Sequence, residues 1–322
     1  MKVFGYAAAH FAVDLCCALL LFRQSGHAQW VLALLLYNFC AFALQLPLGI
    51  AADKLNRNHT VAAAGMLLIA VSFLLSGFLF PALLAGCGNA LFHVGGGIEA
   101  LNQSHHRAFR LGLFVAPGAL GLYLGTQWGK GGPLLWLPPL LLAAAGMLLL
   151  RFGYGKTQNA APLLPSFRMV LWCQAAVVVL RSYIGFCLLF SWNTSFWSGL
   201  AVAAATVLGK AAGGFLLDRW GYTPTVGLSL LSAAACFLFP QFPVFGLMGI
   251  LFFQMTMPVT LWTAARCCPQ AKGFSFGLLT FGLFLGFLPK LLGWPMPQNG
   301  ILWAAGALLS LLLMLPARRS AR

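Results

Sequence analysis

Five ionisable side chains that could bind a charged molecule or exchange protons lie inside strongly apolar stretches of this sequence. His10 and Asp14 are one helical turn apart in the first stretch, His93 and Glu99 lie in the fourth, and Arg181 lies in the seventh. A charged side chain in such a stretch is costly, so it usually marks the path of a substrate or a proton. These residues therefore predict a polar site inside an apolar scaffold.

Asp14 and Arg181 are 167 residues apart, close to half of the 322-residue chain. We expect them at similar depths on opposite walls of a central cavity, where they would form an ion pair when the cavity is empty. A substrate anion, or protonation of Asp14, would then release Arg181. The alternative is a static buried ion pair that only fixes helix packing.

Asn89 and His93 share a helix face, since they are one turn apart. An imidazole can exchange a proton near neutral pH, so His93 is expected to carry a proton or bind substrate, unless it is merely hydrogen-bonded. Glu99 is either a second proton site or the partner of a gate cation. The predicted proton-coupling residues are thus Asp14, His93 and Glu99.

The predicted substrate-binding residues combine these side chains with polar residues of other apolar stretches, and they are Arg181, Asp14, His10, Asn89, His93, Gln174 and Gln254. A kink is expected just before Pro258, beside Gln254. Lys210 either reaches the membrane interface with its long side chain or contacts substrate, and both readings stay open.

The elements that position these residues follow from composition. The chain is 61% hydrophobic and 7% charged, whereas a soluble domain carries roughly 25% charged residues. We therefore predict an all-α membrane protein with about twelve transmembrane helices. The expected helices are 3–22, 29–52, 60–79, 81–103, 110–127, 133–151, 168–190, 196–217, 223–239, 242–264, 273–292 and 299–316. They form two six-helix bundles, 1–151 and 168–322, joined by a cytoplasmic linker, 152–167.

The basic residues also predict orientation. With both termini in the cytoplasm, fourteen Lys and Arg residues face that side, and only Arg23, Lys130 and Lys290 face the other. The net charge of +15 does not indicate nucleic-acid binding, because the basic residues form no cluster with interleaved aromatics. The short connectors suggest a multi-pass protein of the cell membrane, most simply the bacterial inner membrane.

A Gly-x-x-x-Asp-basic pattern occurs once in each half of the sequence, at the end of the second helix of the half. The first copy holds Gly49, Asp53, Lys54 and Arg57, and the second holds Gly214, Asp218, Arg219 and Gly221. The two aspartates are 165 residues apart, and such a repeat is typical of transporters. The glycine would allow close helix contact, and the carboxylate would cap an adjoining helix or pair with a cation.

These two copies resemble the loop motif of the major facilitator superfamily, G-x-L-A-D-[R/K]-x-G-R-[R/K], although the first copy has Asn56 where the motif has Gly. The helix-5 stretch GLFVAPGALGLYLG is similar to that of drug–proton antiporters, and ALFHVGGG is similar to the fosmidomycin-resistance-like branch. The resemblance implies a monomeric secondary transporter whose repeated motif residues hold a cytoplasmic gate during alternating access.

The sequence therefore predicts proton-coupled transport of a small organic anion or drug-like compound, with export favoured. Uptake, or transport of a cation or neutral solute, is the alternative. A polytopic enzyme is the remote one: His10 and Asp14 match the H-x-x-x-D pattern of acyltransferases, but they lie within a span. No cofactor or metal site is expected, because four acidic residues are scattered along the chain and no metal-type spacing occurs.

Overall fold

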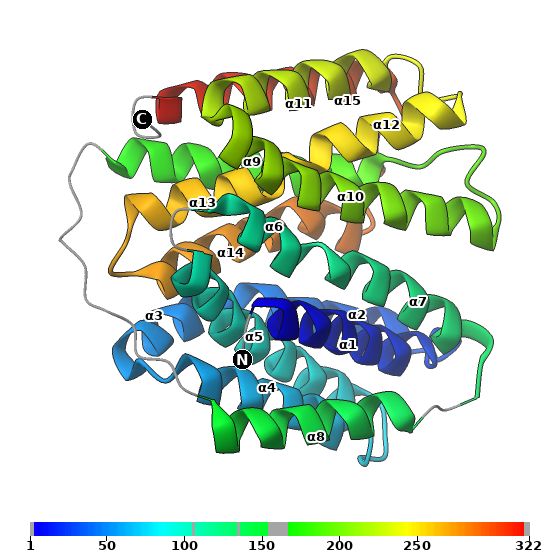
Figure 1. Ribbon diagram of the computed structural model, residues 1–322. Coiled ribbons are helices and arrows are strands. Elements are labelled where there is room, and N and C mark those ends of the chain that lie inside the picture. Colours follow the sequence, from blue (N-terminus) through cyan, green and yellow to red (C-terminus); the bar gives the residue numbers. More distant parts are fainter. Residues whose placement is uncertain (1–2, 105–106, 134–135, 154–166, 319–322) are drawn as a thin grey trace. The chain divides into compact units, whose positions relative to one another are not determined.

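The computed structural model describes residues 3–104, 107–133, 136–153 and 167–318, and every regular element in these ranges is a helix (Figure 1). Most of the predicted linker lies outside the described residues. The elements are α1 Val3–Phe22, α2 Trp30–Asn38, the π-helical turn η1 Phe39–Ala43, α3 Gln45–Leu55, α4 Asn58–Ser72, α5 Leu79–Ser104, α6 Ala108–Val115, α7 Pro117–Gly131, α8 Leu137–Phe152, α9 Phe167–Cys187, α10 Phe196–Trp220, α11 Tyr222–Phe237, α12 Pro243–Gln254, α13 Thr256–Cys267, α14 Lys272–Leu291, α15 Gly300–Met314 and the 3-10 turn η2 Leu315–Arg318.

Nine helical spans in the described part of the chain are long and apolar enough to cross a membrane. Three shorter apolar helices, α4, α8 and α11, complete the predicted set. The prediction of an all-α membrane protein with about twelve transmembrane helices is confirmed.

Three of the long spans are interrupted, and each interruption has a proline in the first turn that follows. These prolines are Pro47 in α3, Pro117 in α7 and Pro258 in α13. A proline ring clashes with the carbonyl four residues earlier and offers no N–H to it. For Pro258 that residue is Gln254, where α12 ends, so the helix is interrupted at the position where the kink was predicted.

Several predicted helix ends differ from the structure by three residues or more, and the largest difference is at the third helix. The third helix was expected to reach residue 79, but α4 ends at Ser72. The apolar residues continue past this end, and Leu74 is 73% exposed, so hydropathy does not reveal where the helix stops. Gly77 then takes a φ of 88°, which a right-handed helix excludes. The seventh helix, expected to reach residue 190, ends at Cys187.

The chain forms two compact units that do not follow the sequence halves strictly. Unit 1 comprises Met1–Gln103, Pro117–Asn159 and Ala271–Phe281, and unit 2 comprises Ser104–Ala116, Ala160–Gln270 and Gly282–Arg322. The first part of α14 therefore belongs to unit 1, although most of the C-terminal half of the sequence belongs to unit 2. The fifth predicted helix is also divided between the units, because α6 belongs to unit 2 and α7 to unit 1.

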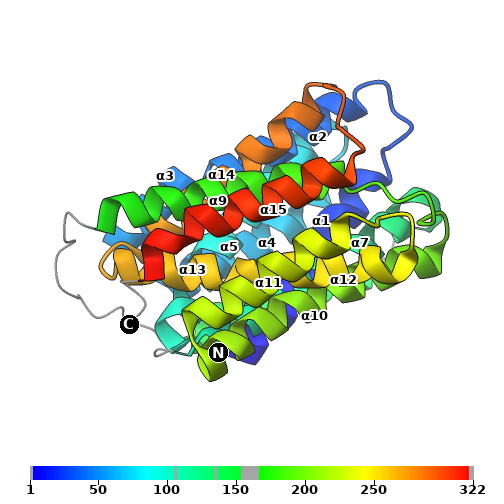
Figure 2. The same ribbon diagram turned by 90° about the horizontal axis from the view of Figure 1, so that it is seen from above.

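Within unit 1, α1 runs along α7 (Figures 1 and 2), and α4 runs along α8 (Figure 1). The contact of α7 with α1 depends on a glycine at every fourth position, at Gly121, Gly125 and Gly129. A Cβ atom would overlap backbone atoms of α1 at Gly121 and Gly125, and the Phe22 Cβ atom at Gly129. Small residues of this kind let transmembrane helices approach closely.

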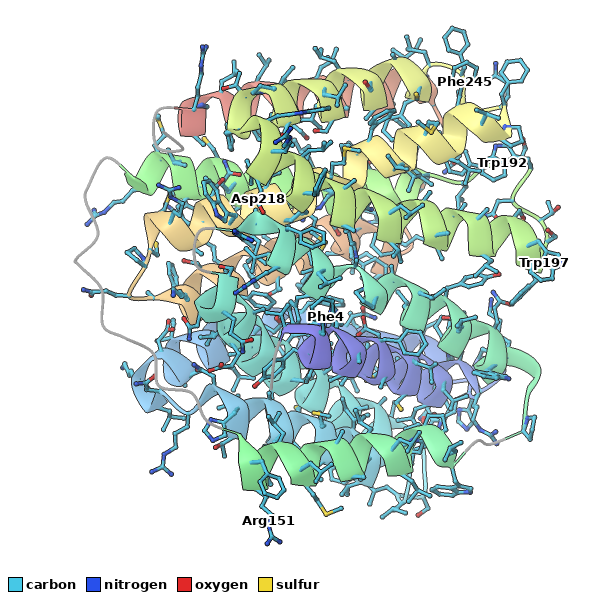
Figure 3. All side chains as sticks on the ribbon, viewed as in Figure 1. Phe4, Arg151, Trp192, Trp197, Asp218 and Phe245 are labelled. Atoms are coloured by element: carbon cyan, nitrogen blue, oxygen red, sulfur yellow. The ribbon has the colours of Figure 1, made fainter. Side chains whose placement is uncertain are left out.

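Within unit 2, α10 packs against α6 (Figure 1) and α12, α9 packs against α13 and α15, and α11 packs against α12 and α15 (Figure 2). Many large apolar side chains of both units point outward, and Phe4 and Trp197 are 70% and 74% exposed (Figure 3). So many exposed apolar side chains indicate a surface that faces lipid.

Candidate functional site

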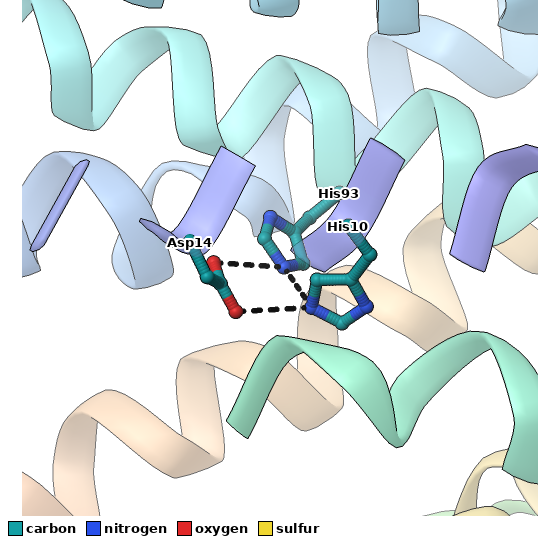
Figure 4. A group of neighbouring side chains, drawn as sticks. All are labelled: His10, Asp14 and His93. Carbon is teal, nitrogen blue, oxygen red and sulfur yellow. Dashed lines mark hydrogen bonds and ion pairs between the residues drawn. The ribbon is translucent and has the colours of Figure 1, made fainter. Parts of the chain in front are cut away.

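A cluster of three ionisable side chains lies inside unit 1, contributed by α1 and α5 (Figure 4). His10 Nε2 lies 3.2 Å from Asp14 Oδ2, and His93 Nε2 lies 3.8 Å from Asp14 Oδ1. The two Nε2 atoms are 2.9 Å apart. The side chains are 7%, 20% and 13% exposed for His10, Asp14 and His93, so the cluster is largely shielded from solvent.

Asn89 orients two members of this cluster. Its side-chain Nδ2 donates to Asp14 Oδ1 at 3.2 Å, and its backbone oxygen lies 2.9 Å from His93 Nδ1. A carbonyl oxygen can only accept, so the Nδ1 atom of His93 carries the hydrogen. Four of the predicted substrate-binding residues are thus brought together. These side-chain types can hold a proton, a cationic group or a transition metal.

Gly118, at the start of α7, brings its backbone close to the cluster. A Cβ atom there would overlap Asp14 Oδ2 and His10 Nε2. The glycine follows Pro117, which interrupts the span between α6 and α7. The interruption of this span therefore occurs beside the ionisable side chains.

Glu99 lies further along α5 with separate partners. It is 5% exposed and accepts hydrogen bonds from Asn58 Nδ2 at 3.3 Å and Gln103 Nε2 at 3.5 Å. Lys272, a candidate gate cation near it, donates to Asn102 Oδ1 at 2.7 Å. The proton-coupling role of Glu99 stays a prediction.

Arg181 lies inside unit 2 and is 5% exposed. Its Nη1 atom donates to the hydroxyl oxygens of Thr256 at 3.4 Å and Thr260 at 3.3 Å. Each hydroxyl in turn donates to the backbone carbonyl three residues earlier, at Phe253 in the last turn of α12 and at Met257 in α13. Neither hydroxyl hydrogen is therefore directed at Arg181, and both threonine oxygens accept hydrogen bonds from the guanidinium.

No acidic side chain of unit 2 is free to neutralise Arg181. The chain has four acidic residues, and Asp218 is the one that falls within unit 2. Both oxygens of Asp218 accept backbone hydrogen bonds elsewhere. Among the described residues the guanidinium has no hydrogen-bond partner besides the two threonines. Asp14 is partnered within unit 1, so the predicted Asp14–Arg181 pair stays a prediction.

The remaining predicted residues are placed as follows. Gln174 is fully buried on α9 near the Tyr222 hydroxyl, Gln254 is half-buried at the end of α12, and Lys210 is half-buried on α10. Sequence reasoning missed Thr260. Its spacing from Thr256, one turn on the same helix face and beside a proline, was the available signal.

The repeated motif forms two equivalent helix caps, one in each unit. Asp53 accepts hydrogen bonds from the backbone N–H groups of Gly273 at 2.8 Å and Phe274 at 2.9 Å, at the start of α14. Asp218 accepts from Ala108 at 2.7 Å and Phe109 at 2.9 Å, at the start of α6 (Asp218 is labelled in Figure 3). Of the two arrangements considered for these carboxylates, the structure shows helix capping. Control of a gate stays a prediction.

The motif glycines lie where the capped helices approach most closely. A Cβ atom on Gly49 would overlap Gly273, and one on Gly214 would come within 2.9 Å of the Phe109 Cα atom. The departure at Asn56 also has an explanation. Asn56 has a φ of 49° and ends α3, as Gly221 with a φ of 80° ends α10. Asparagine tolerates this left-handed conformation better than most residues. The basic residues Lys54, Arg57 and Arg219 are exposed.

The helices, the internal repeat and its paired caps define an all-α membrane protein with the major facilitator fold. Solved structures of this fold match over almost the whole chain. A variant of the E. coli fucose:proton symporter FucP has a TM-score of 0.70 at 13% identity, covering 99% of this chain and 98% of that chain.

Two further structures give the same result. FucP in the outward conformation has a TM-score of 0.64 at 13% identity, covering 99% of this chain and all of that one. The human organic anion transporter MFSD10 has a TM-score of 0.70 at 15% identity, covering 97% of each chain. At these identities the likeness shows the fold. No family model and no curated protein matches the sequence.

Proposed function

We propose that this chain is a secondary active transporter that carries a small organic anion across a membrane by alternating access. The observation that carries the proposal is Arg181, a buried guanidinium in a unit whose one acidic side chain caps a helix instead. A buried charge without an acidic partner is costly, and an anionic substrate would supply the missing charge.

The hydrogen bonds around Arg181 favour an anion with two oxygens on one centre. A guanidinium has five N–H groups in a rigid fork. The two hydrogens on Nη1 are directed to Thr256 and Thr260, while Nε and Nη2 have no partner among the described residues. This remaining edge matches a carboxylate or a phosphonate in a two-point contact. A neutral sugar would leave the charge uncompensated.

The fold supports transport rather than catalysis, since the similar solved structures are transporters and the repeat is typical of alternating access. One of them, human MFSD10, is an organic anion transporter, which agrees with an anionic substrate here. Coupling to protons and export stay predictions from the sequence.

Anion binding to the purified protein tests this proposal. Carboxylates, phosphonates, cations and neutral sugars would be titrated while intrinsic tryptophan fluorescence is followed. Arg181→Gln removes the charge, and Arg151→Gln, on an exposed arginine of α8, is the matched control. Losing hydrogen bonds to a charged group should weaken anion binding about 10- to 150-fold in Arg181→Gln alone. Equal anion affinities in the two variants, or binding of cations only, would overturn the proposal.

A further inference from the structure

The cluster of His10, Asp14 and His93 has the geometry of a metal site. Its three candidate ligand atoms are His10 Nε2, His93 Nε2 and an Asp14 carboxylate oxygen, all within 4.8 Å of one another. Zinc binds imidazole nitrogen and carboxylate oxygen at about 2.0–2.2 Å in a tetrahedron, so neighbouring ligand atoms are about 3.3 Å apart. The two imidazole nitrogens are 2.9 Å apart, and they lie 3.2 Å and 3.8 Å from the two different oxygens of Asp14. With a single Asp14 oxygen as the ligand, the three ligand atoms are within 4.8 Å of one another, so shifts of at most about 1.5 Å would complete three corners of such a tetrahedron.

The hydrogen bonds around the cluster already orient the ligands. His93 Nδ1 lies 2.9 Å from the Asn89 carbonyl, which can only accept. In the neutral imidazole the lone pair is then on Nε2, the atom that faces His10 and Asp14. Metal-binding histidines use this arrangement, in which the second ring nitrogen donates to a carbonyl or carboxylate. Asn89 Nδ2 also holds the Asp14 carboxylate at 3.2 Å.

The charge of the cluster is consistent with an ion. With Asp14 ionised and both imidazoles neutral, the three ligands carry one negative charge, which a divalent cation would more than offset. Gly118 places no side chain against Asp14 Oδ2 and His10 Nε2, where a Cβ atom would overlap both ligand atoms. Two imidazoles and one carboxylate are the ligand set of zinc sites that keep an open position.

We propose that His10, Asp14 and His93 bind one divalent transition-metal ion of the zinc class, with Asn89 as the positioning residue. No local spacing shows this site, because His93 is 83 residues from His10. The sequence analysis therefore expected none. The inference stands apart from the anion site proposed at Arg181, and each can fail without the other.

Cobalt(II) titration of the purified protein tests the site, because tetrahedral cobalt absorbs visible light much more strongly than the hydrated ion. The protein must carry no histidine tag. We expect one Co²⁺ per chain, displaced by Zn²⁺. Asp14→Asn and His93→Gln should abolish this binding. His27→Gln is the matched control, since His27 lies outside the cluster and stacks on Phe78.

Two variants that alter no ligand separate metal binding from misfolding. Asn89→Ala should weaken Co²⁺ binding about 10- to 100-fold, as the loss of outer-shell partners does elsewhere. Gly118→Ala should also weaken it, because the added Cβ atom would overlap Asp14 Oδ2 and His10 Nε2 and displace these two ligand atoms. Failure of the wild-type protein to bind one Co²⁺, or equal binding by His27→Gln and His93→Gln, would overturn the proposal.

X-ray absorption of the zinc-loaded wild-type protein gives an answer that depends on no variant. Two imidazole nitrogens and a carboxylate oxygen at about 2.0–2.2 Å are expected around the zinc. Sulfur ligands would overturn the proposal, because the chain has nine cysteines that could bind the ion elsewhere.

Discussion

Replacing Asp53 by alanine should loosen the first turn of α14. Asp53 holds the N–H groups of Gly273 and Phe274 at 2.8 and 2.9 Å, lengths typical of charge-assisted hydrogen bonds. The alanine variant loses both bonds and leaves two helix-end donors without a partner.

The size of the effect depends on how well water replaces the carboxylate. Loss of an N-cap costs about 0.5–2 kcal/mol, and the half-burial of Asp53 favours the upper end. About 2 kcal/mol corresponds to roughly 30-fold more frequent opening of this turn. Asp218 makes the same pair of bonds to α6 but is exposed, so Asp218→Ala should cost about 1 kcal/mol, or roughly fivefold.

Hydrogen–deuterium exchange measures both effects in the same protein. In Asp53→Ala, amides at the start of α14 should exchange faster while those at the start of α6 keep their rates. Asp218→Ala should show the reverse. Asp53→Asn is the conservative control, because asparagine is also a good cap and should show a smaller effect. Unchanged exchange at Gly273 and Phe274 in Asp53→Ala would refute this reasoning.

Three further changes give separate tests. Asn56→Ala should lower stability by about 1–2 kcal/mol because alanine resists the left-handed conformation at φ 49°, whereas Asn56→Gly should not; equal thermal unfolding of the two variants would contradict this. Gly121→Leu should destabilise the protein by about 1–3 kcal/mol, since any side chain there overlaps the Phe11 carbonyl of α1. An unchanged unfolding temperature would argue against that close contact. Thr260→Val should weaken anion binding roughly fivefold, because it removes one hydrogen bond that positions Arg181. Thr263→Val is the control, because the Thr263 hydroxyl donates to a carbonyl of its own helix. Equal anion titration curves for the two variants would exclude the positioning role.

The helices could be predicted from sequence because a span needs a long apolar stretch, and lipid leaves few alternatives for the backbone. The end of α4 could not, since Leu74 is as apolar beyond the helix as the residues within it. The interruption before Pro258 could be predicted, because a proline affects the turn that precedes it.

In the candidate sites, sequence predicts contacts within one helix but not contacts between helices. His10 and Asp14 are one turn apart, so their contact follows from helix geometry. The approach of His93 depends on how α5 packs against α1, which no local pattern encodes. The motif identified Asp53 as a helix-end residue, but the helix that it caps lies about 220 residues further along the chain.

Transport by the protein in liposomes tests the central claim most directly. Vesicles holding the wild-type protein, Arg181→Gln or Arg151→Gln would be loaded with an unlabelled carboxylate or phosphonate and a pH-sensitive dye. Entry of the labelled anion would then be followed. We predict exchange of anions, but not of neutral sugars or cations, by the wild-type protein and Arg151→Gln, and its loss in Arg181→Gln. The dye reports in the same vesicles whether protons move with the anion. Exchange of a cation or a neutral solute that survives Arg181→Gln would contradict the account.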